Sequence, residues 1–592
     1  MTSEYDIRPV PMYIRSEKSR VDALLARNGL RYEPVDTFYG VYDCDDELLG
    51  GGGLDAGNGI IKCVALDDSL RGSGVANALI SRLRSEASLR GIANVRVFTK
   101  PEYADMFSSL AFKKIGESRE AVMLESSPRQ LREYCDALSR HRRDGRCGVI
   151  VMNCNPFTYG HRYLIEEAAR QVDHLFILCV SEDRSDYPLR SRLAMLREME
   201  SDRVTVLETG PYAISSATFP SYFLKRIDDA TDAHIRLDLD IFCRHIAPAL
   251  GATVRFAGSE PLDPLTARYN ALMAEILPAK GLEFIEIPRL EKSGEPVSAS
   301  RLRDLLSRRR LREALSLTPA DPRFILCRQA HKALVAELDL TPKPGLVDRN
   351  NSGAHTDMDY DLMRRSADAV AQALFDIIAP GELPDVAAGI EAERLMLQAT
   401  GGVNTHKGAI FAFGLILFCI NKLLYTTKED ITPSLLSDEI ASTARRLAAS
   451  HRLDSASHGS EVRRQYGVKG AMDMALEGYK PLFESWLPFL RRHRDEESVL
   501  HRLLLKIISE LDDTNVYHRG GEEGARWLKS EAARLLDDYS EEALARLDRE
   551  CIDRNLSPGG CADMLALTIL TDSLLTDNIN NNTKYLNHDR TH

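Results

Sequence analysis

Gly160 and His161 stand together where a predicted strand meets a predicted helix. The apolar, largely β-branched run Val149–Met152 predicts a strand buried on both faces of a parallel sheet. Turn-forming residues follow at 153–156, and apolar side chains at helical spacing over Arg162–Ala169 predict the helix. Free N–H groups and the helix dipole favour phosphate at such a joint, and the glycine would let a ligand approach the backbone. The histidine is therefore a candidate for work on a phosphate, with simple helix capping as the alternative.

A second candidate for phosphate binding lies far downstream, in the stretch VSASRLRDLL at 297–306. It begins a predicted helix after a candidate strand, FIEIP at 284–288. Ser298, Ser300 and Arg303 lie in its first turns, and hydroxyl and guanidinium groups suit the oxygens of a departing phosphate.

The Thr-x-Gly-His joint and the Ser-x-Ser-x-x-Arg helix start together resemble the nucleotidyltransferase superfamily, in which the first motif is usually His-x-Gly-His. Thr158 occupies the first histidine position. The resemblance implies that a nucleophile attacks the α-phosphorus of a nucleoside triphosphate and pyrophosphate leaves, with catalysis by positioning and charge neutralisation. It implies catalytic roles for His161, Thr158 and Arg303, and nucleotide contacts from Asn155, Pro156, Phe157, Gly160, Ser298 and Ser300.

Length and composition limit the class of protein. A chain of 592 residues is expected to hold several domains, because single cores rarely exceed about 250–300 residues. The net charge of −12 argues against a general nucleic-acid binder. Eleven cysteines without a C-x-x-C pair, and an N-terminus without an apolar core, favour a cytoplasmic protein. The apolar run 409–425 contains Asn421 and Lys422, so we expect a buried core helix and no membrane partner.

The pattern of elements predicts a multidomain protein. Strand candidates at 59–66 and 94–100 flank a helix at 76–90, which indicates an α+β region, and from residue 319 the helical periodicity indicates an all-α region. The predicted boundaries are 1–130 (α+β), 131–147 (helical linker), 148–318 (α/β), 319–575 (all-α) and 576–592 (polar tail).

The first region contains a glycine-rich loop between a strand and a helix. Arg71, Gly72, Gly74 and Ala76 resemble the pyrophosphate loop of GNAT acetyltransferases, in which N–H groups hold coenzyme A. The stretch 98–116 is similar to the end of a GNAT domain, with Ala111 where a glycine is common. The alternative is a glycine-rich turn into an ordinary helix.

Three more stretches, at 213–225, 237–251 and 258–273, complete a resemblance to citrate lyase ligase over roughly residues 1–318. That family implies a GNAT-like domain ahead of a Rossmann-like nucleotidyltransferase domain. It also implies that acetate and ATP give acetyl-AMP, whose acetyl group passes to the thiol of the citrate lyase acyl carrier protein.

Four loops of the all-α region combine acids and bases at helix ends, as a metal–triphosphate site requires. They lie at 341–360, 399–411, 512–524 and 554–568 and resemble triphosphoribosyl-dephospho-CoA synthase, in which the 2′-hydroxyl of dephospho-CoA displaces adenine from ATP. The candidates are Lys343, Asp348, His355, Asp357, His406, Lys407, Asp513, Arg519, Glu522 and Asp563, with Asp348 and Asp513 as catalytic residues and Asp357 and Asp513 as Mg²⁺ ligands. Solvated loop charge is the alternative for each.

One stretch departs from the synthase pattern. Met472 and Met474 stand where arginine and glutamate are expected, so an ion pair or phosphate contact would be missing unless Asp473 replaces the acid.

Two other functions fit the same patterns. The two reactions would also serve malonate decarboxylase, or the GNAT-like region would acetylate amines while the other regions act as a scaffold. We expect ATP as substrate, Mg²⁺ and no tightly bound cofactor. The expected partners are the carrier protein, acetate and dephospho-CoA, without nucleic acid. The GNAT-like domain would be catalytic itself or would dock the carrier protein's prosthetic arm.

Overall fold

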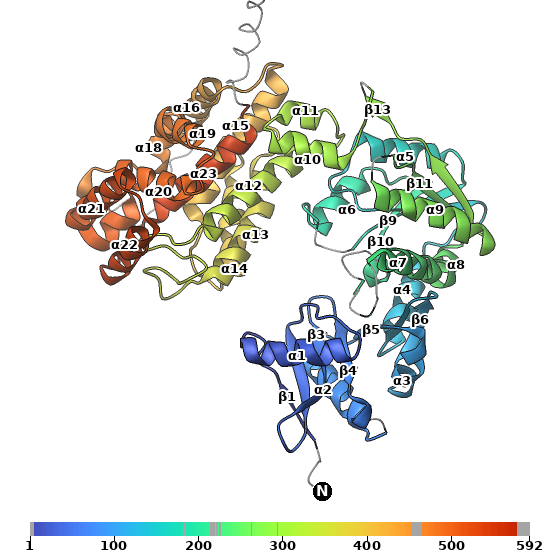
Figure 1. Ribbon diagram of the computed structural model, residues 1–592. Helices are drawn as coiled ribbons and strands as arrows, with labels where there is room; N and C mark the ends of the chain where they lie inside the picture. Colours follow the sequence, from blue (N-terminus) through green and yellow to red (C-terminus); the bar gives the residue numbers. More distant parts are fainter. Residues whose placement is uncertain are drawn as a thin grey trace, which may run out of the picture. The chain divides into compact units, whose positions relative to one another are not determined.

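The computed structural model describes residues 5–70, 72–181, 185–213, 219–220, 223, 227–261, 263–292, 294–450 and 465–576. Contacts between residues divide the chain into two compact units, Met1–Val297 and Ser298–His592 (Figure 1). Arg71, most of 213–225 and nearly all of the predicted tail lie outside the described residues.

The first unit begins with a seven-stranded sheet in the order β1-β2-β3-β4-β5-β7-β6. Only β4 and β5 pair in parallel; the other neighbours are antiparallel. The strands are β1 (Asp6–Pro9), β2 (Thr37–Tyr42), β3 (Leu48–Asp55), β4 (Ile60–Leu66), β5 (Arg96–Thr99), β6 (Lys113–Glu117) and β7 (Val122–Glu125), with helices α1 (Arg15–Arg27), α2 (Val75–Leu89) and α3 (Ala104–Ser109). The predicted strand–helix–strand order of β4, α2 and β5 is confirmed.

A second sheet in the same unit has five parallel strands in the order β10-β9-β8-β11-β12. The strands are β8 (Cys147–Met152), β9 (His174–Cys179), β10 (Val204–Glu208), β11 (Val254–Gly258) and β12 (Glu283–Ile287). The helices are α5 (Tyr159–Ala169), α6 (Leu189–Arg197), α7 (Ile227–Ile241), α8 (Ala247–Leu250) and α9 (Pro264–Ala279), and a short hairpin pairs β13 (Glu291–Lys292) with β14 (Glu295–Pro296). The predicted strand at 149–152 is the central β8, and it is almost wholly buried.

Chain order reverses between β8 and β11, since β9 and β10 lie on one side of β8 and β11 and β12 on the other. Ligands of open parallel sheets bind outside the carboxyl ends of the strands at such a switch point. The loops that follow β8 and β11 are therefore the candidate ligand-binding loops of this sheet.

Helix α4 (Arg129–Ser139) connects the two sheets, which pack together within the first unit. His245 Nε2 lies 2.7 Å from the Ile115 carbonyl oxygen, and Arg244 pairs with Glu117 at 3.0 Å. Gly116 of β6 leaves no room for a side chain because the Ile241 side chain lies against it. The end of β6 is thereby fixed to α7 and the turn after it.

The described part of the second unit is helical throughout. Its helices are α10 (Ala299–Ser307), α11 (Leu311–Leu315), α12 (Pro322–Asp339), α13 (Tyr360–Ile377), α14 (Val386–Ala399), α15 (Lys407–Thr426), α16 (Pro433–Ser450), α18 (Ala471–Leu476), α19 (Leu487–Arg492), α20 (Val499–Glu510), α21 (Thr514–Asp537), α22 (Glu541–Asp553) and α23 (Gly559–Leu574). Helix α15 is long and apolar enough to cross a membrane, but 72% of its apolar window is buried inside the protein. It packs against α12, α13, α14, α16 and α23, so the prediction of a core helix is confirmed.

Candidate functional site

His161 lies in the first turn of α5, directly after the loop that follows β8. The Thr158 N–H donates to His161 Nδ1 at 3.0 Å, and the Thr158 hydroxyl lies 2.9 Å from the same nitrogen. The Thr158 hydroxyl oxygen also accepts from the His161 N–H, so the two residues form a reciprocal cap. Because Nδ1 accepts the backbone hydrogen bond, a neutral His161 carries its proton on Nε2. Helix capping and a chemical role are thus compatible: the cap fixes the tautomer.

The electrostatic surroundings keep this imidazole neutral. Burial, assisted by the positive charge of Arg289, lowers the pKa of His161 to about 4. Near pH 7 the side chain is therefore a neutral donor through Nε2–H rather than a cation.

Gly160 allows another part of the backbone to approach closely. A Cβ at this position would overlap the carbonyl oxygen of Val297. Val297 directly precedes Ser298, the first residue of the second motif. The glycine thus fixes the end of the first unit against the β8–α5 joint.

The β8–α5 loop is supported by Arg192, which is fully buried on α6. Its guanidinium donates to the Asn153 carbonyl oxygen at 3.1 Å and to the Val180 carbonyl oxygen at 2.7 Å. Asn155 accepts a hydrogen bond from the Tyr187 N–H at 2.9 Å. Sequence reasoning missed Arg192, because its partners lie in three separate segments.

The other residues of this loop also serve its shape. Phe157 is 1% exposed and stacks on the His161 ring at 6.0 Å between centroids, and Pro156 is buried. Two buried thiols lie at the same edge, Cys154 in the loop and Cys179 at the end of β9. Burial raises the pKa of Cys179 to about 11 and that of Cys154 well above its usual range.

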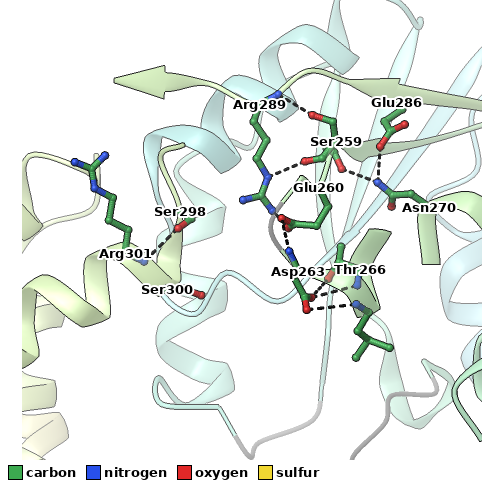
Figure 2. Close-up of polar contacts among 12 residues, drawn as sticks. Ser259, Glu260, Asp263, Thr266, Asn270, Glu286, Arg289, Ser298, Ser300 and Arg301 are labelled. Atoms are coloured by element: carbon green, nitrogen blue, oxygen red, sulfur yellow. Dashed lines mark hydrogen bonds and ion pairs between the residues drawn. The ribbon is translucent and has the colours of Figure 1, made fainter. Parts of the chain in front are cut away.

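A charged network missed by sequence reasoning lies at the carboxyl ends of β11 and β12 (Figure 2). Arg289 Nε donates to the Ser259 carbonyl oxygen at 2.7 Å, and its Nη2 forms an ion pair with Glu260. The carboxylate of Asp263 accepts from the Thr266 N–H at 3.2 Å and caps α9. The signal in the sequence was the Gly-Ser-Glu-Pro turn after β11. Its glutamate, Glu260, pairs with Arg289, which lies 29 residues later and which no local pattern reveals.

The Ser-x-Ser-x-x-Arg motif begins the second unit, as helix α10. Ser298 is the N-cap, and its hydroxyl accepts from the Arg301 N–H at 3.1 Å. Arg303 Nη2 donates to the Ser300 hydroxyl at 3.3 Å. The helix predicted after this motif is confirmed, with the serines and the arginine in its first turns.

In the first sheet, Gly72 and Gly74 have φ values of +78° and +77°, which explains the glycines of the loop before α2. Gly74 is the N-cap of α2, and Ala76 lies in the first turn of the helix. Ala111 also has a positive φ, +67°, where GNAT domains commonly have glycine. Arg71, the charged member of the predicted loop, lies outside the described residues.

In the second unit, Lys343 is 1% exposed and its ammonium pairs with the buried Glu337 of α12. Asp348 accepts hydrogen bonds from the N–H groups of Lys343, Asn350 and Asn351 at 2.9, 2.7 and 3.2 Å. The predicted catalytic carboxylate of Asp348 therefore shapes the loop between α12 and α13. Asp548 on α22, which sequence reasoning missed, supports the same loop through the Gly345 N–H at 2.9 Å.

Asp513 is the N-cap of α21 and joins it to the start of α23. Its carboxylate accepts from the Asn515 and Cys561 N–H groups, both at 2.8 Å, and burial raises its pKa. His406, 3% exposed, lies before α15 with Nδ1 2.7 Å from the Ser366 hydroxyl. Burial and the charge of Lys343 lower the pKa of His406 to about 4, so this side chain is also neutral.

Arg519 and His355 lie side by side in a polar cluster of the second unit. Arg519 Nη1 donates to the Ala354 carbonyl oxygen at 2.7 Å, and its Nη2 lies 3.2 Å from His355 Nδ1. His355 Nε2 lies 2.8 Å from the Ser557 hydroxyl. The exposed carboxylate of Asp357 lies 3.7 Å from His355. Three of the four motif loops therefore converge here.

Two candidates have partners at the surface instead. Lys407 pairs with Glu393 at 2.8 Å, and Glu522 pairs with Arg526 on the outer face of α21 at 2.7 Å. For these residues the structure favours the alternative of solvated charge.

The stretch 470–476, which departs from the synthase pattern, contains a short helix. Met474 is buried, and Asp473 accepts a hydrogen bond from the Gly470 N–H at 2.8 Å, so Asp473 caps this helix.

The predicted Mg²⁺ ligands have separate surroundings. Asp357 is exposed beside His355, whereas Asp513 is buried with both oxygens bonded to N–H groups. Within the described ranges, no group of three or more His, Cys, Asp or Glu side chains is placed to hold a metal ion. The described residues thus provide no preformed metal cage.

Two family models match the chain, one in each half. Residues 147–322 match the citrate lyase ligase C-terminal domain, and residues 325–582 match the ATP:dephospho-CoA triphosphoribosyl transferase family. The [citrate [pro-3S]-lyase] ligases of Klebsiella pneumoniae and Haemophilus influenzae are 39% and 40% identical over 313 and 311 residues. These matches cover 52% and 51% of this chain and 91% and 92% of the relatives.

A probable 2-(5''-triphosphoribosyl)-3'-dephosphocoenzyme-A synthase of Salmonella choleraesuis is 40% identical over 263 residues. The match covers 40% of this chain and 86% of the relative. The chain is therefore a fusion that belongs to the citrate lyase ligase family in its N-terminal half and to the triphosphoribosyl-dephospho-CoA synthase family in its C-terminal half.

Proposed function

We propose that this chain matures citrate lyase through two ATP-dependent reactions, one in each half. The N-terminal half joins acetate to ATP, releases pyrophosphate, and passes the acetyl group of acetyl-AMP to the thiol of the citrate lyase acyl carrier protein. The C-terminal half makes 2′-(5″-triphosphoribosyl)-3′-dephospho-CoA from ATP and dephospho-CoA and releases adenine. The observation that carries this proposal is that relatives of both kinds are matched over nearly their whole length.

The ligase reaction uses His161 as a neutral hydrogen-bond donor. Negative charge grows on the α-phosphate as the acetate oxygen attacks, and a fixed Nε2–H stabilises that charge without having to reorient. Arg303, with Ser298 and Ser300, binds the departing pyrophosphate. Thr158 acts through the histidine, because it holds Nδ1 as the acceptor.

Both folds of the first unit support this assignment. We infer a GNAT-like domain from the mostly antiparallel sheet with a parallel β4–β5 pair and the positive-φ glycines before α2. We infer a Rossmann-like nucleotidyltransferase domain from the parallel sheet whose switch point lies beside the His161 loop. The GNAT-like domain would hold the pantetheine-pyrophosphate arm of the carrier protein through Gly72–Ala76 and Arg71.

In the synthase reaction, Arg519 and His355, together with Lys343 and His406, would contact the nucleotide. Mg²⁺ usually binds through substrate phosphates and one or two carboxylates. The exposed carboxylate of Asp357, beside Arg519 and His355, suits an ion that arrives with ATP. Asp513 fits this role less well, because both of its oxygens accept backbone hydrogen bonds. The protein would act in the cytoplasm.

The test uses the purified full chain. With ATP, labelled acetate and the thiol form of the citrate lyase carrier protein, we expect acetylated carrier, AMP and pyrophosphate in equal amounts. With ATP and dephospho-CoA we expect adenine. Faster acetylation of a malonate decarboxylase carrier would change the client, and acetyl transfer from acetyl-CoA to amines without pyrophosphate would favour the acetyltransferase alternative.

A further inference from the structure

The half-buried carboxylate of Asp563 stands out among the acids of the second unit. It lies near the N-terminal end of α23, and a Cβ added at Gly408, in the first turn of α15, would overlap its Oδ2. Glu337 and Asp513 lie near enough for their charges to act on it. Those two acids have partners: Glu337 pairs with Lys343, and Asp513 accepts two backbone hydrogen bonds. Asp563 accepts no hydrogen bond from any residue that the structure describes.

A second polar group without a partner lies close by. Tyr479 is 0% exposed, and within the described ranges its hydroxyl has no hydrogen-bond partner. The hydroxyl is near enough to Asp563 for the carboxylate charge to act on it, yet the two are not hydrogen-bonded. Leaving a buried hydroxyl unpaired costs its desolvation energy without a hydrogen bond in return, so such a group requires an explanation. A substrate group between the two side chains would satisfy both.

We propose that Asp563 is the general base of the synthase reaction and that Tyr479 hydrogen-bonds the nucleophilic hydroxyl of dephospho-CoA. A hydroxyl has one hydrogen to donate and lone pairs that accept, so it can donate to the carboxylate and accept from the tyrosine at the same time. This inference rests on the proposed synthase function and assigns residues to its chemical step.

The carboxylate of Asp563 takes the proton of the 2′-hydroxyl while a lone pair of that oxygen forms a bond to the anomeric carbon of the ATP ribose. The bond from that carbon to the adenine nitrogen breaks, and its electron pair leaves with adenine. Adenine takes up one proton, and Asp563 gives one proton to water. The number of protons is therefore unchanged over the whole reaction.

The environment strengthens Asp563 as a base. Burial, with the like charges of Glu337 and Asp513, raises its pKa well above the usual range, so the carboxylate holds a proton more tightly than an exposed one. The titratable groups facing this region come from several elements: Glu337 on α12, Lys343 after it, His406 before α15, Tyr479 after α18 and Asp513 before α21. A raised proton affinity favours general base catalysis, because the carboxylate then takes up the hydroxyl proton more readily.

The first variant is Asp563→Asn in the full chain, with adenine release from ATP and dephospho-CoA as the readout. We expect kcat to fall by about 10²–10⁴-fold, the usual contribution of a general base, with the KM for ATP changed by less than about threefold. The wild-type enzyme should lose activity at acid pH as Asp563 is protonated, and the residual activity of the variant should not show this acid limb. Asp572→Asn is the matched control, because Asp572 is a buried acid of the same helix that pairs with Arg309 and Arg491. It should lower the Tm and leave kcat within about threefold.

The second variant, Tyr479→Phe, removes only a hydroxyl that has no partner in the described structure. Its Tm should stay equal or rise, since no hydrogen bond is lost. Its kcat should nevertheless fall by about tenfold, with the larger part of the change in kcat rather than in the KM for dephospho-CoA. A lower Tm with unchanged kcat would overturn the role of Tyr479.

Two results would overturn the role of Asp563. One is an Asp563→Asn enzyme with kcat within threefold of wild type. The other is activity restored by raising Mg²⁺, which would make Asp563 a metal ligand. Absence of adenine release from the wild-type chain would instead refute the proposed synthase function, so the two failures are distinguishable.

Discussion

His161 has a single donor available for catalysis, because its Nδ1 accepts the Thr158 N–H and its proton lies on Nε2. Removal of that donor should resemble the loss of an oxyanion-hole donor, so we expect His161→Ala to lower acetyl-adenylate formation by about 10²–10³-fold. Acetate-dependent ATP–pyrophosphate exchange measures this directly. Adenine release by the other half should be unchanged, and His161→Gln, which offers an amide N–H, should recover part of the loss. Equal loss of both activities would indicate misfolding instead.

The same residue sets the acid side of the pH dependence. The pKa of His161 is lowered from 6.5 to about 4, so the neutral form persists as the pH falls through 6.5 and is lost only near pH 4. Pyrophosphate exchange should therefore show no acid limb between pH 5.5 and 8. A limb near pH 6.5 that vanishes in His161→Gln would contradict the neutral donor.

Helix α5 and the strand before it illustrate how far a sequence defines a site. The apolar run, the turn residues and the helical spacing predicted β8 and α5 correctly, because these signals are local. The contacts that hold the loop are not local. Arg192 reaches Asn153 from 39 residues away, and Arg289 reaches Glu260 across 29 residues. No spacing pattern in one sequence reveals such partners, since they depend on the order of strands in the sheet.

In the all-α half, the sequence predicted the motif loops but not the contacts that their side chains make. Acidic and basic residues in loops were expected to face a ligand, but Asp348 uses its carboxylate to bind loop N–H groups. Lys407 and Glu522 are exposed and pair with Glu393 and Arg526. The type of residue was informative, whereas its direction depended on tertiary packing.

The joint between β8 and α5 should tolerate no side chain at Gly160. In Gly160→Ala the new methyl group would overlap the Val297 carbonyl oxygen, so either the helix start or the end of the first unit must move. We expect a lower Tm for the first unit and at least about a tenfold loss of pyrophosphate exchange, since small displacements of catalytic groups are costly. Gly389→Ala is the control: nothing lies within 4 Å of its Cβ position on α14, and it should stabilise by about 0.5–1 kcal/mol.

The two halves of the chain, residues 147–322 and 325–582, carry different chemistries, so damage to one should leave the other active. In Asp513→Asn an amide N–H₂ replaces one acceptor of the hydrogen bonds that tie α21 to α23. We expect adenine release to be strongly reduced and acetylation of carrier protein to keep its wild-type rate. Both rates can be followed in one preparation. Loss of acetylation as well would contradict the assignment of each activity to its own half.

The buried thiols beside the His161 loop have a consequence for a protein that handles a mixed anhydride. Acetyl-AMP acylates thiolates readily, and only the deprotonated form of a cysteine attacks. Burial raises the pKa of Cys179 to about 11 and that of Cys154 well above its usual range, so neither offers a thiolate near pH 7. Self-acetylation is thereby suppressed, and the incoming thiol of the carrier protein meets no competitor from these two residues. After many turnovers, mass spectrometry should find both cysteines unmodified.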